Sequence, residues 1–421
     1  MTTTWAQVLH FYQPPTQTHD VLRRVVEESY RLVLSVLEAN PHARIGVNIQ
    51  GVLVDLLVDH GLGDVVERLD GLVSRGQVEL LGSGRFHAIL PLMPEAYRRR
   101  SIAEQADTLR RHFPALAAAK LDEPPGRLPG FFPPEMCWSS DLAAPIAEAG
   151  HRWVALSGVA CPGPWPTGEV LRTNADGRSL AVLFRDDVRS NRISFRQTDP
   201  ERFLGDIAGL AAAGPSYVVT AMDAETYGHH IKGWERDFLD TAYRRLAPES
   251  GPDASRVVMA TPSEVVERFP AGRCVTPHAS SWSTTPADLA AGNPYPLWQA
   301  PGNRTHALQW EYVDHCLTLV GAADAHAATA EARKYASIAA EAIEPALHSC
   351  QFWWASRLPM WDVSMIHRGL QLLTVALLNA SKSIQLGEAP LDLKREARWR
   401  IAAAAEVRSR LEHELFVDDA P

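Results

Sequence analysis

Two carboxylates of this chain each follow a run of apolar residues that has the composition of a buried strand. Glu135 follows Phe132, Pro133 and Pro134, and Asp223 follows the apolar run 217–222. Such a pair suits glycosidic bond cleavage, in which one carboxylate attacks the anomeric carbon while a protonated carboxyl group donates to the leaving oxygen. Each residue alone has a structural alternative, since Glu135 fits a salt bridge and Asp223 fits a helix cap.

Other polar and aromatic residues are suited to binding sugar hydroxyls and sugar faces. His10 and Arg185 end apolar runs, His87 follows a third run, and Glu225 comes two residues after Asp223. A single histidine is more often a hydrogen-bonded core residue, and a tryptophan is more often packing. Because several of these residues occur at successive strand ends, we favour the functional interpretation. The candidate substrate-binding residues are His10, His87, Arg185, Glu225, Trp282, Trp353 and Trp354.

The first two thirds of the chain alternate between apolar runs and helical patterns. We expect strands at 5–10, 45–49, 77–81, 128–132, 153–156, 180–184, 217–222 and 257–260. Helical spacing of apolar residues is clear over 21–38 and 64–73. Strands that alternate with helices form a parallel sheet, which at this length predicts a closed or nearly closed β/α barrel. Catalytic side chains of such barrels stand at the carboxyl ends of the strands.

The pattern changes after residue 275. Residues 276–304 are rich in proline and aromatic residues without clear periodicity, which is typical of a functional loop. Beyond them, helical patterns cover 305–320, 324–348, 363–382 and 391–415. We therefore predict a catalytic barrel over 1–275, an active-site loop over 276–304 and a C-terminal helical domain over 305–421.

The amino-acid composition indicates which classes of binding partner and which location in the cell are expected. The 421 residues carry a net charge of −9, which argues against nucleic acid, because phosphate binding requires a basic face. The five cysteines are scattered without a CxxC pair, as expected for reduced thiols in the cytoplasm. Residues 1–10 have the pattern of a first strand and not of a signal peptide. We found no apolar run long enough for a membrane span, and the sequence leaves the oligomeric state open.

Four motifs, in order along the chain, resemble those of glycoside hydrolase family 57. They are His10-Phe11-Tyr12-Gln13-Pro14, His87-Ala88-Ile89-Leu90-Pro91-Leu92, Gly130-Phe131-Phe132-Pro133-Pro134-Glu135 and Asp223-Ala224-Glu225. The loop around Trp282 and Trp298 is also similar to the family, and a fifth motif fits only loosely near 350–354. Two positions depart from the family pattern: Tyr12 replaces a second histidine, and Ala224 replaces a glycine.

The resemblance implies an incomplete (β/α)7 barrel with a helical C-terminal domain. It also implies a retaining mechanism on α-1,4- or α-1,6-glucans, with Glu135 as nucleophile, Asp223 as general acid/base and no metal or other cofactor. For that mechanism we expect a carboxyl separation of about 5–5.5 Å and a raised pKa for Asp223. Activities of the family include α-amylase, 4-α-glucanotransferase and branching enzyme, so the acceptor, water or sugar, stays open.

Two other functions remain as alternatives. One is a catalytically inactive carbohydrate-binding homologue, against which the presence of both carboxylates argues. The other is a metal-dependent polysaccharide deacetylase, which holds a divalent ion with an aspartate and two histidines. The usual His-x-x-x-His pair of that class is missing from the expected place, and His229 and His230 are adjacent.

Overall fold

A computed structural model describes residues 1–117, 128–248 and 251–416. The described chain forms two compact units. The barrel unit comprises Met1–Arg85 and Leu90–Pro286, and the helical unit comprises Phe86–Ile89 together with Ala287 onward. Each unit is described separately below.

The barrel unit contains a ring of parallel strands. One part has the order β3 (Val78–Leu80), β2 (Ile45–Ile49), β1 (Thr3–Phe11) and β8 (Ser216–Asp223), and the other part includes β4 (Gly130–Phe131), β5 (Trp153–Ser157) and β7 (Arg178–Arg185). Hydrogen bonds from Gly82 N to Gly130 O and from Phe132 N to Gly82 O, both 2.9 Å, join β3 to β4. A 2.8 Å bond from Asp186 N to Val219 O joins the end of β7 to β8. Within the described residues, seven parallel strands thus form a (β/α)7 ring, as predicted.

Three more strands flank this ring. β9 (Val257–Met259) pairs with the start of β1, β6 (Val170–Ala175) pairs antiparallel with β7, and β10 (Ala271–Cys274) pairs with β6. The sequence analysis missed β6 and β10. The connection between β6 and β7 is Asp176-Gly177, with φ of 49° and 82°, and an Asp-Gly pair with positive φ is a strong hairpin signal.

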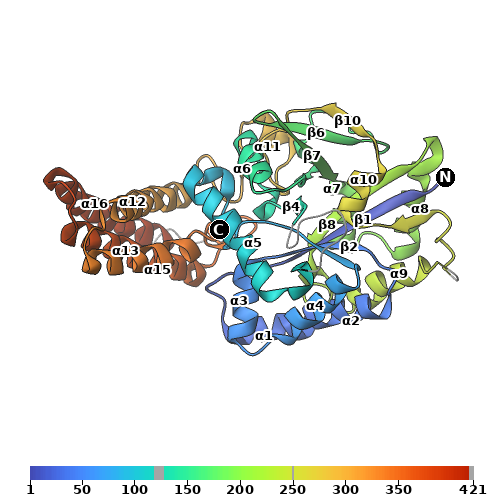
Figure 1. Ribbon diagram of the computed structural model, residues 1–421, viewed down its shortest axis with the longest axis horizontal. Helices are drawn as coiled ribbons and strands as arrows, with labels where there is room; N and C mark the ends of the chain where they lie inside the picture. Colours follow the sequence, from blue (N-terminus) through green and yellow to red (C-terminus); the bar gives the residue numbers. More distant parts are fainter. Residues whose placement is uncertain (118–127, 249–250, 417–421) are drawn as a thin grey trace. The chain divides into compact units, whose positions relative to one another are not determined.

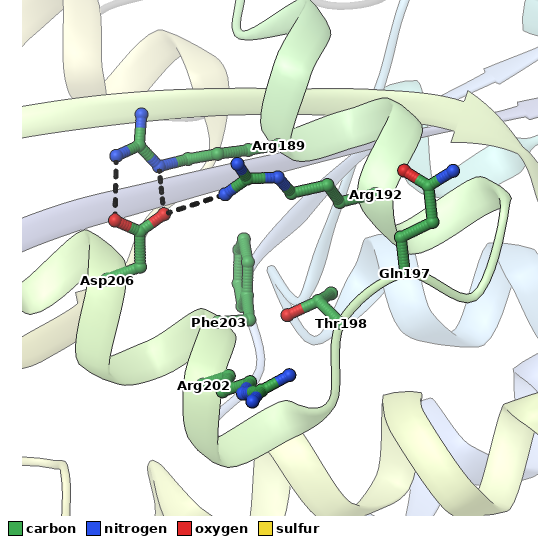
Figure 2. Close-up of a pocket in the computed structure, with 7 residues that line it drawn as sticks. All are labelled: Arg189, Arg192, Gln197, Thr198, Arg202, Phe203 and Asp206. Atoms are coloured by element: carbon green, nitrogen blue, oxygen red, sulfur yellow. Dashed lines mark hydrogen bonds and ion pairs between the residues drawn. The ribbon is translucent and has the colours of Figure 1, made fainter.

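Helices surround the strands of the barrel unit (Figure 1). Their bounds are α1 (His19–Val25), α2 (Arg31–Ala39), α3 (Gly51–Asp59), α4 (Asp64–Ser74), α5 (Glu95–His112), α6 (Ala143–Glu148), α7 (Asp187–Ser194), α8 (Pro200–Ala208), α9 (Thr241–Arg245) and α10 (Pro262–Arg268). The short connection between α7 and α8 borders a hollow, shown in Figure 2. The helix predicted over 21–38 is interrupted, because Val26–Tyr30 forms a π-helical turn between α1 and α2.

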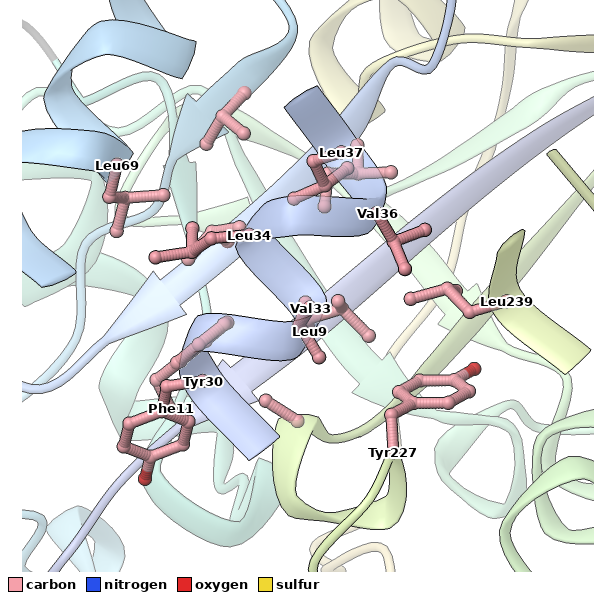
Figure 3. Close-up of a cluster of buried hydrophobic side chains, with 14 of the residues drawn as sticks. Leu9, Phe11, Tyr30, Val33, Leu34, Val36, Leu37, Leu69, Tyr227 and Leu239 are labelled. Carbon is pink, nitrogen blue, oxygen red and sulfur yellow. The ribbon is translucent and has the colours of Figure 1, made fainter. Parts of the chain in front are cut away.

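A large core of the barrel unit lies between β1 and the helices around α2 (Figure 3). Val33, Leu34 and Leu37 of α2 are fully buried, as is Leu9 of β1. Full burial of one such side chain contributes roughly 1.5–3 kcal/mol relative to exposure. Phe11 and Tyr30 pack in the same cluster with ring centroids 4.9 Å apart, which fixes the π-helical turn against β1.

The helical unit consists mainly of four long helices. They are α12 (Arg304–His326), α13 (Ala330–Ala346), α15 (Val363–Leu386) and α16 (Leu391–Phe416), with the short helix α14 (Cys350–Trp353) between α13 and α15. The short helix α11 (Pro286–Ala290) lies within the predicted loop 276–304. The prediction of a helix from residue 324 was wrong at its start, since α12 continues to His326 and the Thr329 hydroxyl caps α13. None of the helices described is long and apolar enough to cross a membrane. Residues 417–421 of the predicted helical domain lie outside the described residues.

Candidate active site

Glu135 stands directly after β4 on a constrained turn. Its backbone lies in the left-handed region, with φ 57° and ψ 18°, and Met136 also has a positive φ of 49°. Such a conformation costs of order 1–3 kcal/mol for a residue other than glycine and persists where neighbouring structure enforces it. Here the backbone N–H of Trp282 donates to the backbone carbonyl oxygen of Glu135 at 3.1 Å. Beside this bond, Trp138 and Ser280 exchange two backbone hydrogen bonds. The turn therefore holds the Glu135 side chain in a fixed direction.

The Trp282 side chain binds the Glu135 carboxylate. Its indole Nε1–H donates to Glu135 Oε2 at 2.8 Å. The same ring meets the His10 ring edge to face at 5.9 Å between centroids, and the Arg185 guanidinium carbon lies 6.0 Å from its centroid. Trp282 thus links three of the predicted site residues at the carboxyl ends of three different strands.

Asp223 is the last residue of β8 and is paired in register with His10 of β1. Burial raises the pKa of its carboxyl group from the usual 3.8 to about 6, and the positive charge of Arg185 opposes this rise. Arg185 is itself fixed, since its Nε–H donates to Ala221 O at 2.8 Å and its terminal nitrogens donate to Asp187 and Asn191. The raised pKa has the predicted direction, and it allows Asp223 to hold a proton in mildly acidic solution.

Glu225 is a second buried carboxyl group, and two donors converge on one of its oxygens. Gln13 Nε2 donates to Glu225 Oε1 at 2.9 Å, and the Tyr30 hydroxyl donates to the same oxygen. Burial, followed by the charge of Asp223, raises the pKa of Glu225 to about 8, while both donors lower it. Glu225 therefore keeps its proton to a higher pH than an ordinary glutamate, because burial and the charge of Asp223 both oppose its ionisation.

His10 is held by a buried polar network between β1, β2 and β4. Its Nδ1 lies 2.7 Å from Asn48 Oδ1, its register partner on β2, and its ring stacks on Phe132 at 5.1 Å. Because Gln50 Nε2 also donates to Asn48 Oδ1, this oxygen is an acceptor, and we assign the proton of His10 to Nδ1. Burial lowers the pKa of His10 to about 4, so the imidazole is neutral at neutral pH.

His87, Trp353 and Trp354 belong to the helical unit. His87 has a φ of 60°, and its Nδ1 lies 2.8 Å from Ser349 Oγ. Trp354 is buried and meets His348 edge to face at 5.9 Å, whereas Trp353 is partly buried at the end of α14. Their substrate-binding roles stay predictions.

Several residues that hold this site were not predicted from the sequence. They are Tyr30, Asn48, Gln50 and Ser83, and Gln13 was noted only as part of a motif. Asn48 interrupts an apolar strand and Gln50 follows it directly, which is a signal that inspection of every strand end would have found. Among the described residues, no group of three or more histidine, cysteine, aspartate or glutamate side chains is arranged to hold a metal ion.

Comparison with known protein families shows to which family the chain belongs. A model described as "Glycosyl hydrolase family 57" matches residues 6–277, which is more than half of the chain and includes Glu135 and Asp223. The chain belongs to glycosyl hydrolase family 57. The earlier resemblance is thereby confirmed at the level of the family.

Two curated relatives and one solved structure show how similar this chain is to other members of the family. It is 26% identical to an alpha-amylase of Pyrococcus abyssi over 297 residues, which cover 67% of this chain and 42% of the relative. It is 24% identical to a 4-alpha-glucanotransferase of Thermococcus litoralis, with 67% and 41% covered. The chain thus spans less than half the length of these relatives. The family 57 branching enzyme of Pyrococcus horikoshii has the same fold, with a TM-score of 0.68, 13% identity and coverage of 95% of this chain and 94% of that one.

Proposed function

We propose that this family 57 member is a retaining glycosidase or transglycosylase that acts on α-1,4-glucans, with α-1,6 linkages as a further substrate class. The observation that carries the proposal is the presence, at the carboxyl ends of the barrel strands, of a fixed carboxylate and of a carboxyl group with a raised pKa. Trp282 and the turn after β4 fix Glu135, and burial gives Asp223 a raised pKa. One residue has the properties of a nucleophile and the other those of a general acid.

The reaction proceeds in two displacements. In the first, Glu135 attacks the anomeric carbon, the bond to the leaving oxygen breaks, and Asp223 gives its proton to that oxygen. The result is a glycosyl ester on Glu135 and an ionised Asp223. In the second, Asp223 takes a proton from the incoming hydroxyl group, whose oxygen displaces Glu135. Water as the incoming group gives hydrolysis, and a sugar hydroxyl gives transfer.

The choice of α-glucan as substrate is supported by the relatives. An alpha-amylase and a 4-alpha-glucanotransferase match two thirds of the chain, and a branching enzyme has the same fold. The partly buried indole of Trp282 beside Glu135 offers an apolar ring to the C–H face of a glucose unit.

The direct test is incubation with maltoheptaose and with amylose, in which products are followed by chromatography and their anomeric configuration by early proton NMR. We expect the α-anomer to form first, and shorter or rearranged chains to show whether water or sugar is the acceptor. First appearance of the β-anomer would contradict retention. Glu267→Gln, an exposed carboxylate on α10, serves as control and should behave as the wild type.

Three further assays separate the proposed function from the two alternatives. Activity should survive EDTA, because the proposed steps use only carboxyl groups. Release of acetate from an acetylated polysaccharide, lost with EDTA and restored by zinc, would favour the deacetylase. Binding of amylose without turnover under all conditions would favour the inactive carbohydrate-binding protein.

A further inference from the structure

A hollow on the barrel unit, bordered by α7, α8 and the connection 195–199, is not used by the proposed reaction. Its volume is about 420 Å³, within the roughly 300–1,000 Å³ typical of small-molecule pockets. Figure 2 shows the side chains around it, with two arginines of α7 on one side, Arg202 of α8 on another and the Phe203 ring between them. The residues that line the hollow are Arg189, Arg192, Gln197, Thr198, Arg202, Phe203 and Asp206.

The charged groups around the hollow are predominantly positive. The lining includes three arginines and one aspartate, although the whole chain carries a net charge of −9. Arg189 is fully engaged, because its guanidinium binds Asp186 at 2.6 Å and Asp206 at 3.0 and 3.1 Å. These ion pairs hold the Arg189 side chain of α7 in place and bind Asp206 of α8 to it.

The two other arginines have only distant carboxylate partners. Arg192 lies 4.0 Å from Asp206, and Arg202 lies 4.0 Å from Asp199. Their side chains are 52% and 80% exposed, and within the described part of the chain neither guanidinium makes a hydrogen bond. Both therefore have donors available for an anion that enters the hollow.

Guanidinium groups match the oxygens of a phosphate group better than they match most anions, because their planar donors bind two oxygens at once. The lining also includes the Thr198 hydroxyl and the Gln197 amide, which can bind the hydroxyl groups of a ligand. Since the hollow also has room for more than an inorganic anion, its chemistry fits a small phosphorylated molecule.

We propose that Arg192 and Arg202 form a binding site for the phosphate group of a small molecule, of the size of a sugar phosphate, in the hollow between α7 and α8. Arg189 joins α7 to Asp206 of α8 and so supports this site. The site lies on the same helix whose Asp187 and Asn191 bind Arg185, so its occupant contacts an element that also supports the candidate active site.

The test is calorimetric titration of the full chain with glucose 6-phosphate, inorganic phosphate and glucose, for the wild type and the double variant Arg192→Gln/Arg202→Gln. We expect glucose 6-phosphate to bind the wild type, and the double variant to bind it about tenfold or more weakly, because charge-assisted hydrogen bonds are lost. Binding should also weaken as NaCl is added, since both arginines are exposed. Equal affinity for inorganic phosphate would support the site and identify the phosphate group alone as its ligand.

The matched control is Arg24→Gln, which removes an exposed arginine of α1 away from the lining and should leave binding unchanged. Melting temperatures of all variants should match the wild type, because the replaced side chains are exposed. The proposal is overturned if neither phosphate compound binds at millimolar concentration, if glucose binds as tightly as its phosphate, or if the folded double variant binds like the wild type.

Discussion

The indole nitrogen of Trp282 donates a hydrogen bond to the Glu135 carboxylate at 2.8 Å. This contact joins a residue of the loop after the barrel strands to the predicted nucleophile, 147 positions away in the sequence. A donor to one carboxylate oxygen leaves the other oxygen to attack and fixes the plane of the group. We therefore propose two functions for Trp282, which are to orient the carboxylate of the proposed nucleophile and to offer an apolar ring to a sugar unit.

The first prediction follows from this double role. Trp282→Phe keeps an aromatic ring but removes the N–H donor. The kcat should therefore fall by about tenfold to a hundredfold, because hydrogen bonds to charged groups contribute about 1.5–3 kcal/mol. The KM for long glucans should change little, because the ring remains. Trp282→Ala should lower kcat and also raise KM. Steady-state kinetics together with a melting curve measure both effects. The sequence alone indicated Trp282 only as a substrate-binding residue, because its contact with Glu135 is not visible in the sequence.

Trp165→Phe is the matched control, because Trp165 is another partly buried tryptophan of the barrel unit, in contact with Phe184. It should leave kcat unchanged. An unchanged kcat in Trp282→Phe would mean that the hydrogen bond to Glu135 has no catalytic effect.

The pH dependence of activity should identify the general acid. A group with a pKa raised to about 6 is protonated below that pH, so kcat/KM should fall as pH rises through about 6 if Asp223 donates the proton. Asp223→Ala should lose this basic limb and remain comparatively active on an α-glucosyl fluoride, whose leaving group needs no proton. If Glu225→Ala loses the limb instead, and the wild-type limb lies near pH 8, the roles of the two residues are reversed.

Glu225 should also give the fold a measurable pH dependence. Its pKa is about 8 in the folded chain, against the usual 4.5, so the folded state binds the proton more tightly than the unfolded state. The stability from this proton is fully present below pH 4.5 and is lost as pH rises through about 8. The melting temperature of the wild type relative to Glu225→Gln should therefore fall between pH 5 and pH 8.

Tyr30→Phe provides the companion measurement. The Tyr30 hydroxyl lowers the pKa of Glu225 by donating to it, and a phenylalanine keeps the packing against Phe11. This variant should shift the loss of stability to higher pH. A pH dependence of melting that is identical in the wild type and in both variants would show that Glu225 does not titrate in this range.

The sequence predicts those site residues that a local pattern marks, and it does not predict the partners that distant segments bring to them. His10, Glu135, Arg185 and Asp223 stand at the ends of apolar runs, and a parallel barrel brings such ends to one side. The partners that fix them come from distant segments. Tyr30 reaches Glu225 across 195 positions, and its direction depends on a π-helical turn that has no distinct sequence pattern.

In the fold too, elements with a clear local sequence pattern were predicted and those without one were missed. The eight predicted strands are all present, because each is an apolar run of the right length between helical patterns. β6 and β10 were missed because they flank the ring and lack a continuous buried run: β6 mixes buried and exposed residues, and β10 is mostly exposed. The segment Phe86–Ile89 belongs to the helical unit although it lies within the barrel sequence, and no local pattern marks that change of unit.

The central claim, that Glu135 is the nucleophile of a retaining reaction, is tested most directly by azide rescue of Glu135→Ala on an α-glucosyl fluoride. The variant should be slower than the wild type by several orders of magnitude, and azide should restore turnover with a β-glucosyl azide as product, because the anion enters from the side that the carboxylate has vacated. Near-normal turnover without azide would contradict the account, and so would an α-glucosyl azide as the rescued product.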